Sequence, residues 1–370
     1  MDRLRAFQES LLRQGIGAAL VTSPDNIRYL TGYYHWNSLM PLAAAVVPAR
    51  GDPVLLALRA DETLAREASA VRVAVYDAGT QGFRATAGRA REALDAGALE
   101  PRILGVEIAT VTLDRYHVLE EVFPGCGFVD VAGALADLRL VKDEAEQATL
   151  RRAAHLVGSA LKHTIAGVSP GMSEIEIKGA MDSAVYAESA RRWPAAMVQS
   201  VTNVLSGPKA NRLHDAAAGR PAGPGELLFI MGGAIVDGYW ANGARTVFVP
   251  GGSPPADAPR LLEVAVKAQR AGFERLLPGR PLGEAVRAAD GFLADAGLLD
   301  RKTYPMFRGL GLKHNERPAA SELDLVLRPG MCLCSQSYLR RDDFIVGVSD
   351  SILIGEDGAI MLTDREGAAR

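Results

Sequence analysis

The sequence predicts an α+β protein with two domains, a smaller mixed α/β domain over residues 1–138 and a larger domain over residues 139–370. The length of 370 residues is one reason, because a domain usually has about 100–200 residues. The order of the elements is another. Helical and strand patterns alternate in the first part, whereas the second part has strands, two helices and strands again, which favours an antiparallel sheet.

The first domain begins with a helix, because apolar residues recur at helical spacing at Leu4, Phe7, Leu11 and Leu12. The following segment, GIGAALVTS, predicts a strand that ends in a turn at residues 23–25, where the sequence is Ser-Pro-Asp. The same kinds of pattern predict further strands at LAAAVVP, PVLLAL, 71–76, 103–107 and FVDV, and helices at 60–70, 83–97 and 112–122.

The second domain opens with LRLVKD, which leads into a long helix that extends to about residue 165. Asp143 is a suitable N-cap, and Glu144 and Glu146 lie in the first turn, where the helix dipole favours negative charge. A second helix begins at Ser173, and Glu176 three residues later predicts a capping box. The remaining pattern predicts strands at AMVQSVTNVLSG, GELLFIMGGAIVDGY and ARTVFVPG, helices near 256–275 and 283–297, and strands at PGMCLCSQSYL and VSDSILIGEDGAIMLT.

Composition limits the function classes. The chain has 41 Lys and Arg against 44 Asp and Glu, and its net charge of −3 argues against nucleic-acid binding through bulk electrostatics. It has no run of about 18 apolar residues, and the N-terminus MDRLRAFQES has an amphipathic pattern instead of the apolar stretch of a signal peptide. We therefore expect a cytoplasmic protein with no nucleic-acid or membrane partner. Three cysteines are too few for a cysteine-based zinc site or a disulfide framework.

Several motifs of the second part follow one another in a characteristic order. They are LRLVKDE, SGPKANRLH, GGAIVDGYWANGARTVFV, RGLGLKHNERP, LRPGM and GEDGAIMLT. Together with SPDNIRYLTGY near the N-terminus, they resemble creatinases, prolidases and aminopeptidases P over nearly the whole chain. The resemblance implies a pita-bread fold for the second domain, a mixed α/β first domain, and a homodimer in which the partner's N-terminal loop borders the active site.

The resemblance also implies where metal ligands would stand, and there this sequence departs from the family. Metallopeptidases of this fold use two Asp, one His and two Glu. In the matching motifs, those five positions hold Met231, Asn242, Arg308, Gln336 and Ser349. A dinuclear site needs anionic carboxylates to offset about four positive charges, but these residues supply none and Arg308 adds a cation. His314, one residue out of register, cannot replace four carboxylates. We therefore expect no bound metal and no cofactor.

By resemblance, His214 in SGPKANRLHD matches the histidine that is the acid/base group of metal-free creatinase. Imidazole titrates near neutral pH and can accept and return a proton in one cycle, so His214 is the expected catalytic base. The alternative is an exposed loop histidine. Glu316 keeps the position of a glutamate of the family. It is interpreted as a second catalytic residue, which orients His214 or binds a cationic group, or else as a surface partner of Arg317.

An inward-facing Arg308 would favour a carboxylate or phosphate on the ligand, and the alternative is an arginine that turns to solvent or pairs with an acidic neighbour. The neutral amides of Gln336 and Asn242 suit a polar small molecule, or else they fill the space that the metal ions would occupy. Aromatic residues cluster in pockets and interfaces, and the aromatic run after SPDNIRYLTG is expected to border the pocket or the dimer core. The predicted substrate-binding residues are Arg308, Gln336, Asn242, Asn315, Tyr239, Tyr34, His35 and Trp36.

The resulting prediction is a metal-independent enzyme that acts on a small polar, anionic metabolite. By resemblance to creatinase, the favoured reaction is hydrolysis of a non-peptide C–N bond with His214 as general acid/base. Two alternatives stay open. The same histidine would serve as the base of a lyase, dehydratase or isomerase, and the fold would also suit a catalytically inactive binding protein.

Overall fold

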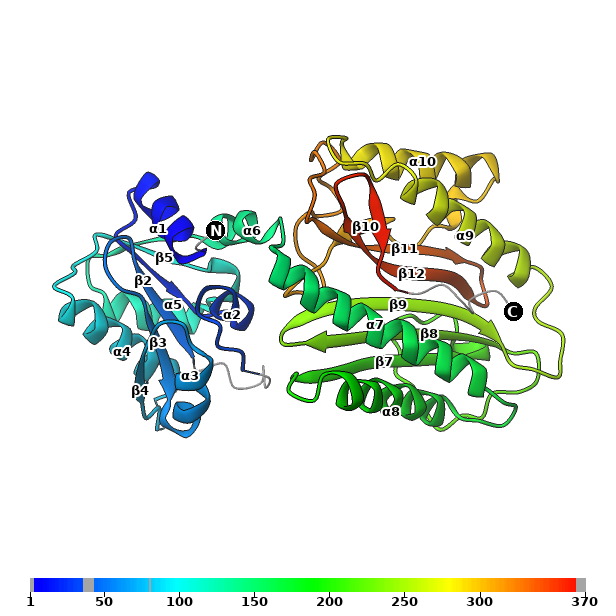
Figure 1. The fold of residues 1–370 in the computed structure, drawn as a ribbon, viewed down its shortest axis with the longest axis horizontal. Coiled ribbons are helices and arrows are strands. Elements are labelled where there is room, and N and C mark those ends of the chain that lie inside the picture. Colours follow the sequence, from blue (N-terminus) through cyan, green and yellow to red (C-terminus); the bar gives the residue numbers. More distant parts are fainter. Residues whose placement is uncertain (1–2, 36–42, 80, 364–370) are drawn as a thin grey trace. The chain divides into compact units, whose positions relative to one another are not determined.

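The computed structural model describes residues 3–35, 43–79 and 81–363. The chain divides into two compact units, Met1–Arg139 and Leu140–Arg370, each of which is described by itself (Figure 1). The α+β class and the pita-bread fold predicted from the sequence are confirmed.

The N-terminal unit is built on a mixed six-stranded sheet in the order β4-β3-β2-β1-β5-β6. Strand β2 runs antiparallel to its neighbours β1 and β3, whereas the pairs β3–β4, β1–β5 and β5–β6 are parallel. The elements are α1 (Arg3–Arg13), β1 (Ala18–Val21), α2 (Pro24–Thr31), β2 (Ala44–Pro48), β3 (Val54–Leu58), α3 (Glu62–Ala68), β4 (Arg72–Tyr76), α4 (Phe83–Ala96), β5 (Ile103–Val106), α5 (Leu113–Val122), β6 (Gly127–Asp130) and α6 (Ala132–Arg139).

Two helices of this unit were not predicted. The segment predicted as a turn at residues 23–25 is the start of α2, with Ser23 as N-cap and Pro24 in the first turn, where a missing backbone N–H costs nothing. Helix α6 occupies a segment for which no helix was predicted.

The C-terminal unit contains an antiparallel sheet in the order β10-β11-β12-β9-β8-β7, with β13 paired to β12. Strand β9 begins at Tyr239, which is earlier in the sequence than the predicted strand ARTVFVPG. The elements are α7 (Glu144–Gly167), α8 (Glu174–Arg192), β7 (Val198–Ser206), β8 (Leu227–Val236), β9 (Tyr239–Phe248), α9 (Ala258–Phe273), α10 (Leu282–Asp295), β10 (Phe307–Gly309), β11 (Cys332–Arg340), β12 (Ile345–Ile354) and β13 (Ala359–Met361).

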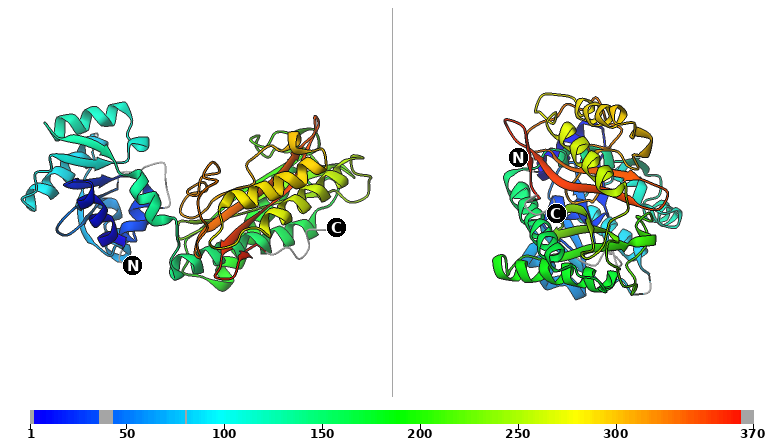
Figure 2. Two further views of the ribbon diagram at one scale, coloured as in Figure 1. Left: turned by 90° about the horizontal axis from the view of Figure 1, so that it is seen from above. Right: turned by 90° about the vertical axis from the view of Figure 1, so that its right-hand side faces the viewer.

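The four helices of the C-terminal unit pack on the sheet in two pairs. Helices α7 and α8 contact β7, β8 and β9, whereas α9 contacts β11 and β12 and carries α10 (Figures 1 and 2). The predicted capping boxes are confirmed at both early helices, Asp143 with Glu146 and Ser173 with Glu176.

Alternation along the strands separates the sheet into a helix face and an opposite face. Ile230 packs with residues of α7 and α8, and a Cβ on Gly243 would lie 2.9 Å from Leu161 of α7, so this glycine allows close packing of the helix. The intervening residues face the other way. Cross-strand pairing places five of them in one row from β7 to β11, namely Asn203, Met231, Ala244, Ser349 and Gln336.

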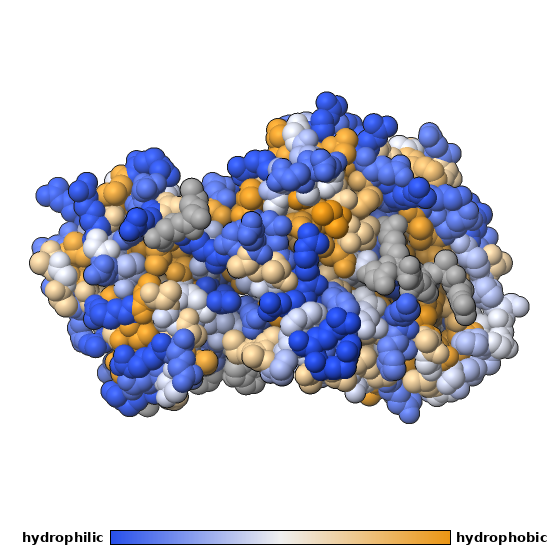
Figure 3. Space-filling model, in the orientation of Figure 1, coloured by the Kyte–Doolittle hydropathy of each residue, from blue (hydrophilic) through white to orange (hydrophobic). Residues whose placement is uncertain are grey.

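The face of the molecule shown in Figure 3 carries many hydrophilic residues with smaller hydrophobic areas between them. Among the helices that the structure describes, none combines the length and the apolar character that a bilayer crossing requires.

Candidate functional site

A cavity of about 320 Å³ lies within the C-terminal unit on the sheet face opposite α7 and α8. Strand residues supply its floor, and two loops supply its rim. The wall side chains include Val201, Asn203, Leu213, His214, Met231, Trp240, Asn242, Tyr304, Arg308, His314, Gln336, Tyr338 and Ser349.

The five positions that the family resemblance identified as former metal-ligand positions all line this cavity. Each stands on a different strand, from β8 to β12, and the cross-strand register brings them together. They are Met231, Asn242, Arg308, Gln336 and Ser349.

Arg308 is the central polar residue of the cavity and is only 7% exposed. Its Nε donates to Gln336 Oε1 at 3.0 Å, and its Nη2 donates to His314 Nε2 at 3.0 Å. In the amide orientation that satisfies both ends of Asn242, the amide oxygen accepts from Nη2 at 3.2 Å. Nη1 is buried and has no hydrogen-bond partner in the described part of the chain. The arginine therefore faces inward.

His314 is held neutral by its surroundings. Burial of the imidazole is the main cause that lowers the pKa of His314 to about 4, and the positive charge of Arg308 is the second. Because its Nε2 accepts from Arg308, its proton belongs on Nδ1. The ring also meets Trp240 edge to face, with 5.5 Å between the centroids. Among the described residues that line the cavity, Arg308 is the one Lys or Arg, and none is Asp or Glu.

His214 lies at the rim, on the loop that follows β7. Its Nε2 is 3.0 Å from the hydroxyl of Tyr304, and both residues also border a second, more open cavity of about 450 Å³. The hydrogen-bonded pair therefore stands between the inner and the outer cavity.

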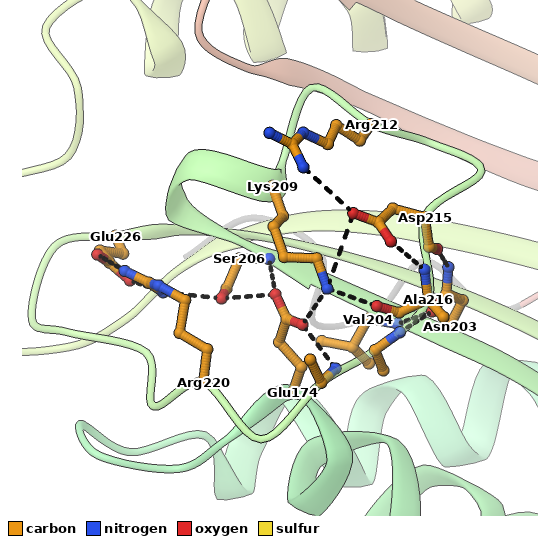
Figure 4. Close-up of polar contacts among 12 residues, drawn as sticks. Glu174, Asn203, Val204, Ser206, Lys209, Arg212, Asp215, Ala216, Arg220 and Glu226 are labelled. Carbon is orange, nitrogen blue, oxygen red and sulfur yellow. Dashed lines mark hydrogen bonds and ion pairs between the residues drawn. The ribbon is translucent and has the colours of Figure 1, made fainter.

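The loop that carries His214 is fixed by the buried carboxylate of Glu174, at the start of α8 (Figure 4). One carboxylate oxygen accepts from the backbone N–H and the hydroxyl of Ser206, at 2.8 and 2.9 Å, and the other from Lys209 Nζ at 3.0 Å and the N–H of Ala218 at 2.8 Å. Burial alone raises the pKa of Glu174, but these hydrogen bonds outweigh it, so the pKa is lowered. Both ends of the loop are thereby attached to one anion.

Glu316, which was predicted as a second catalytic residue, is not among the residues that line the cavity. Its Oε1 accepts from Lys142 Nζ at 2.7 Å, and both side chains are almost fully buried. Its Oε2 accepts from the backbone N–H of Lys313 at 3.3 Å. Glu316 therefore stabilises the loop that presents His314 to Arg308.

Other predicted binding residues also lie outside the cavity. Tyr239 is buried, and its hydroxyl donates to Glu146 Oε1 at 3.0 Å, while Asn315 is exposed on its loop without contributing to the wall. Tyr34 and His35 belong to the N-terminal unit, where His35 Nε2 lies 3.7 Å from a carboxylate oxygen of Asp61. Trp36 lies outside the described residues.

The predicted substrate-binding set left out several wall residues, among them Trp240, Tyr304 and His314. Trp240 shares a face of β9 with Asn242, so alternation along the strand was a usable signal. His314 and Tyr304 come from irregular segments, and their contacts depend on tertiary packing. Within residues 3–35, 43–79 and 81–363, no group of three or more His, Cys, Asp or Glu is placed to hold a metal ion.

Comparisons with known proteins agree with this architecture. The model of metallopeptidase family M24 matches residues 148–356, and that of the creatinase/prolidase N-terminal domain matches residues 3–141. A protein named putative dipeptidase YkvY, from Bacillus subtilis, is 25% identical over 365 residues, which cover 98% of each chain. The Xaa-Pro dipeptidase of Pyrococcus horikoshii is 24% identical over 372 residues, or 99% of this chain and 97% of that one.

Solved structures show the same fold at lower identity. The prolidase from Pyrococcus horikoshii superposes with a TM-score of 0.85 at 22% identity, and covers 98% of both chains. The X-Pro aminopeptidase from Thermotoga maritima gives a TM-score of 0.84 at 19% identity, over 100% of this chain and 99% of that one.

These comparisons correct the predicted function. Metal-independent hydrolysis of a non-peptide C–N bond is wrong, because relatives that match the chain over nearly its full length are named dipeptidases and Xaa-Pro dipeptidases. They are peptidases, so the comparisons support an enzyme family that acts on peptides.

Proposed function

The chain belongs to metallopeptidase family M24, and on that premise we propose that the cavity of its C-terminal unit holds short peptides without the metal ions that the family name implies. One observation supports the proposal most directly. The cavity lies in the part of the chain that matches the family and is formed by residues of five adjoining strands. Its polar floor contains a guanidinium and no carboxylate. Its volume of about 320 Å³ suits a small ligand such as a dipeptide.

The names of the relatives support the ligand class. Proteins from Bacillus and Mycobacterium that are 25% identical over 95–98% of this chain are named dipeptidases. Apolar and aromatic walls at Leu213, Trp240 and Tyr338 offer contact to peptide side chains, while Gln336 offers an amide group to a peptide backbone.

The residues of the cavity do not fit the implied metal ions. Hard and borderline divalent cations require carboxylate or imidazole ligands, but the five positions on the strands offer a thioether, two amides, a hydroxyl and a guanidinium. The guanidinium of Arg308 repels a cation, and the Nε2 lone pair of His314 is directed at that guanidinium. We therefore derive no reaction step through a metal, and the proposal is that this chain has lost the ligand set.

Peptide hydrolysis is the second candidate, because the relatives are named as peptidases over nearly the full length of this chain. Both candidates take peptides as ligands, but hydrolysis also requires a nucleophile, which a metal ion would generate from bound water. Adding metal therefore distinguishes the two candidates.

Isothermal titration calorimetry with a panel of dipeptides tests the proposal, using protein treated with EDTA and, in parallel, protein supplied with Mn²⁺. We expect dipeptides to bind with the same affinity before and after EDTA treatment. We also expect the purified protein to contain less than one equivalent of transition metal. Hydrolysis that depends on added Mn²⁺ would refute the loss of the ligand set and establish the second candidate. Failure of the whole panel to bind would refute the ligand class.

We propose in addition that the chain forms a homodimer, as its resemblance to the family implies. Tyr34 and His35 of one N-terminal unit would then be near the cavity of the partner. Light scattering on the purified protein should give twice the chain mass of 39.3 kDa, and a single-chain mass would rule the dimer out.

A further inference from the structure

The strongest unexplained feature of the cavity is the charge of Arg308. The side chain is more than nine-tenths buried, and its three polar contacts are all neutral acceptors, on Gln336, His314 and Asn242. No carboxylate among the described residues lies within ion-pair distance of it. A buried charge without a counter-ion is costly, so its surroundings favour an anion from outside the chain.

The free hydrogen-bonding capacity of Arg308 lies at one atom. A guanidinium has five N–H donors; the Nε hydrogen and both hydrogens of Nη2 are used by the three neutral acceptors. The two hydrogens of Nη1 are left in a buried position without a partner in the described structure. An anion that reaches the guanidinium from the cavity would neutralise Arg308.

The neighbouring groups select the charge of that anion. His314 is neutral at physiological pH, because burial and Arg308 depress its pKa, so it adds no second positive charge. No other Lys or Arg lines the cavity among the described residues, and His214 lies at the exposed rim. One fixed positive charge matches one negative charge, which favours a monoanionic carboxylate over a phosphate dianion.

We infer that the guanidinium of Arg308 anchors the carboxylate of the ligand, so the site selects short peptides with a free C-terminal carboxylate. The peptide part of this inference rests on the proposed function, whereas the carboxylate part rests on Arg308 alone. The carboxylate oxygen accepts from the guanidinium, and the rest of the ligand lies against the apolar wall.

Calorimetry with three matched probes tests the inference: Gly-Leu, its C-terminal amide, and N-acetyl-leucine. The expected result is that Gly-Leu binds the wild-type protein about tenfold or more tightly than its amide, and that Arg308→Gln removes this difference. Arg308→Lys keeps the charge but not the planar geometry, so it should retain part of the preference. Arg280→Gln, at an exposed arginine outside the cavity, is the matched control and should bind like the wild type.

The outcomes separate this inference from the proposed function. Equal binding of Gly-Leu and its amide to the wild-type protein would overturn the carboxylate anchor and leave peptide binding intact. Binding of N-acetyl-leucine that requires Arg308, without binding of either peptide, would retain the anchor and overturn the peptide proposal. Failure of all three probes to bind, or displacement of Gly-Leu by equimolar inorganic phosphate, would overturn the anchor. The melting temperature of each variant shows that it is folded, and Arg308→Lys supplies the test if Arg308→Gln is not.

Discussion

Replacing Glu174 by Gln tests whether one buried carboxylate holds the loop that carries His214. The carboxylate has two donors at each oxygen, Ser206 N–H and hydroxyl at one and Lys209 and Ala218 at the other. A glutamine of the same shape keeps one acceptor oxygen. Its NH₂ group then faces either the N–H of Ser206 or the two donors of Lys209 and Ala218, and it cannot accept from any of them.

The expected loss of stability follows from these contacts. Removing one partner of a buried ion pair costs about 3–5 kcal/mol, because the other charge is left uncompensated. Lys209 keeps its hydrogen bond to the carbonyl of Ala216 and an ion pair with Asp215 at 4.0 Å, and its side chain is 17% exposed, which lowers the cost. We therefore expect Glu174→Gln to lower the free energy of unfolding by about 3 kcal/mol, at the lower end of that range.

Urea and thermal unfolding measure this effect. For a unit of this size, about 3 kcal/mol corresponds to a decrease of about 6–12 °C in melting temperature. Glu263→Gln is the control, since Glu263 is exposed and pairs only with Lys267 one turn away, so its replacement should change stability by less than about 0.5 kcal/mol. A loss below about 1 kcal/mol for Glu174→Gln would show that the carboxylate is not the anchor of the loop.

The sign of the pH dependence provides a second check on Glu174. Its pKa is lowered in the folded protein, so the unfolded chain binds the proton more readily. The stabilisation is therefore present above the unfolded pKa of about 4.3 and is lost as the pH falls through the lower folded value. The difference in stability between wild type and Glu174→Gln should shrink in acid, and a difference that stays constant would contradict this reasoning.

Four further predictions concern other contacts. The pKa of His314 is lowered to about 4, so the stability of the wild-type protein should fall as the pH drops from about 6.5 towards 4. The loss should be no more than about 1–2 kcal/mol, because the ring is partly exposed. Urea unfolding of His314→Gln at several pH values should show a weaker pH dependence of stability. Gly243→Ala should lose about 1–3 kcal/mol in urea unfolding, because its Cβ would lie 2.9 Å from Leu161, whereas Gly291→Ala, where a Cβ meets open space in α10, should not destabilise. Lys142→Met should cost about 3 kcal/mol by removing the partner of buried Glu316, and a loss below 1 kcal/mol would exclude this ion pair as a structural contact. Tyr239→Phe should cost about 1 kcal/mol in thermal unfolding and leave dipeptide affinity unchanged, so an altered affinity would return Tyr239 to the site.

Local sequence signals predicted the elements that local chemistry stabilises. The capping boxes at Asp143 and Ser173 lie within four residues of chain, so the sequence contains their complete stabilising interaction. Helix α2 has no side-chain cap of this kind. Thr22 and the N-cap Ser23, which precede the helix, are held by Glu107, which lies more than eighty positions away and accepts from their backbone N–H groups at 2.8 and 2.9 Å. A tertiary contact of this kind cannot be read from a local pattern.

The same distinction explains which site residues were predicted. Motif positions on the strands converge because strand register is a regular property of the sheet, and Ser349 lies opposite both Ala244 and Gln336 for that reason. Glu316 was assigned to catalysis because its position matched a motif, but the sequence does not reveal that Lys142, 174 positions away, is its partner. Motif position therefore predicted location better than it predicted contacts.

The three acceptors around Arg308 explain how the cavity keeps its charge available. A carboxylate at position 242 or 336 would pair with the guanidinium and leave no need for an external anion. Neutral amides and a histidine held neutral satisfy only part of the donor set and orient the side chain, while the net charge of the group stays at +1. Neutral amides at positions 242 and 336 are thus consistent with a buried arginine at position 308. Restoring a carboxylate, as in Gln336→Glu, should weaken binding of Gly-Leu while stabilising the protein without ligand, and tighter binding would contradict the role assigned to the charge of Arg308.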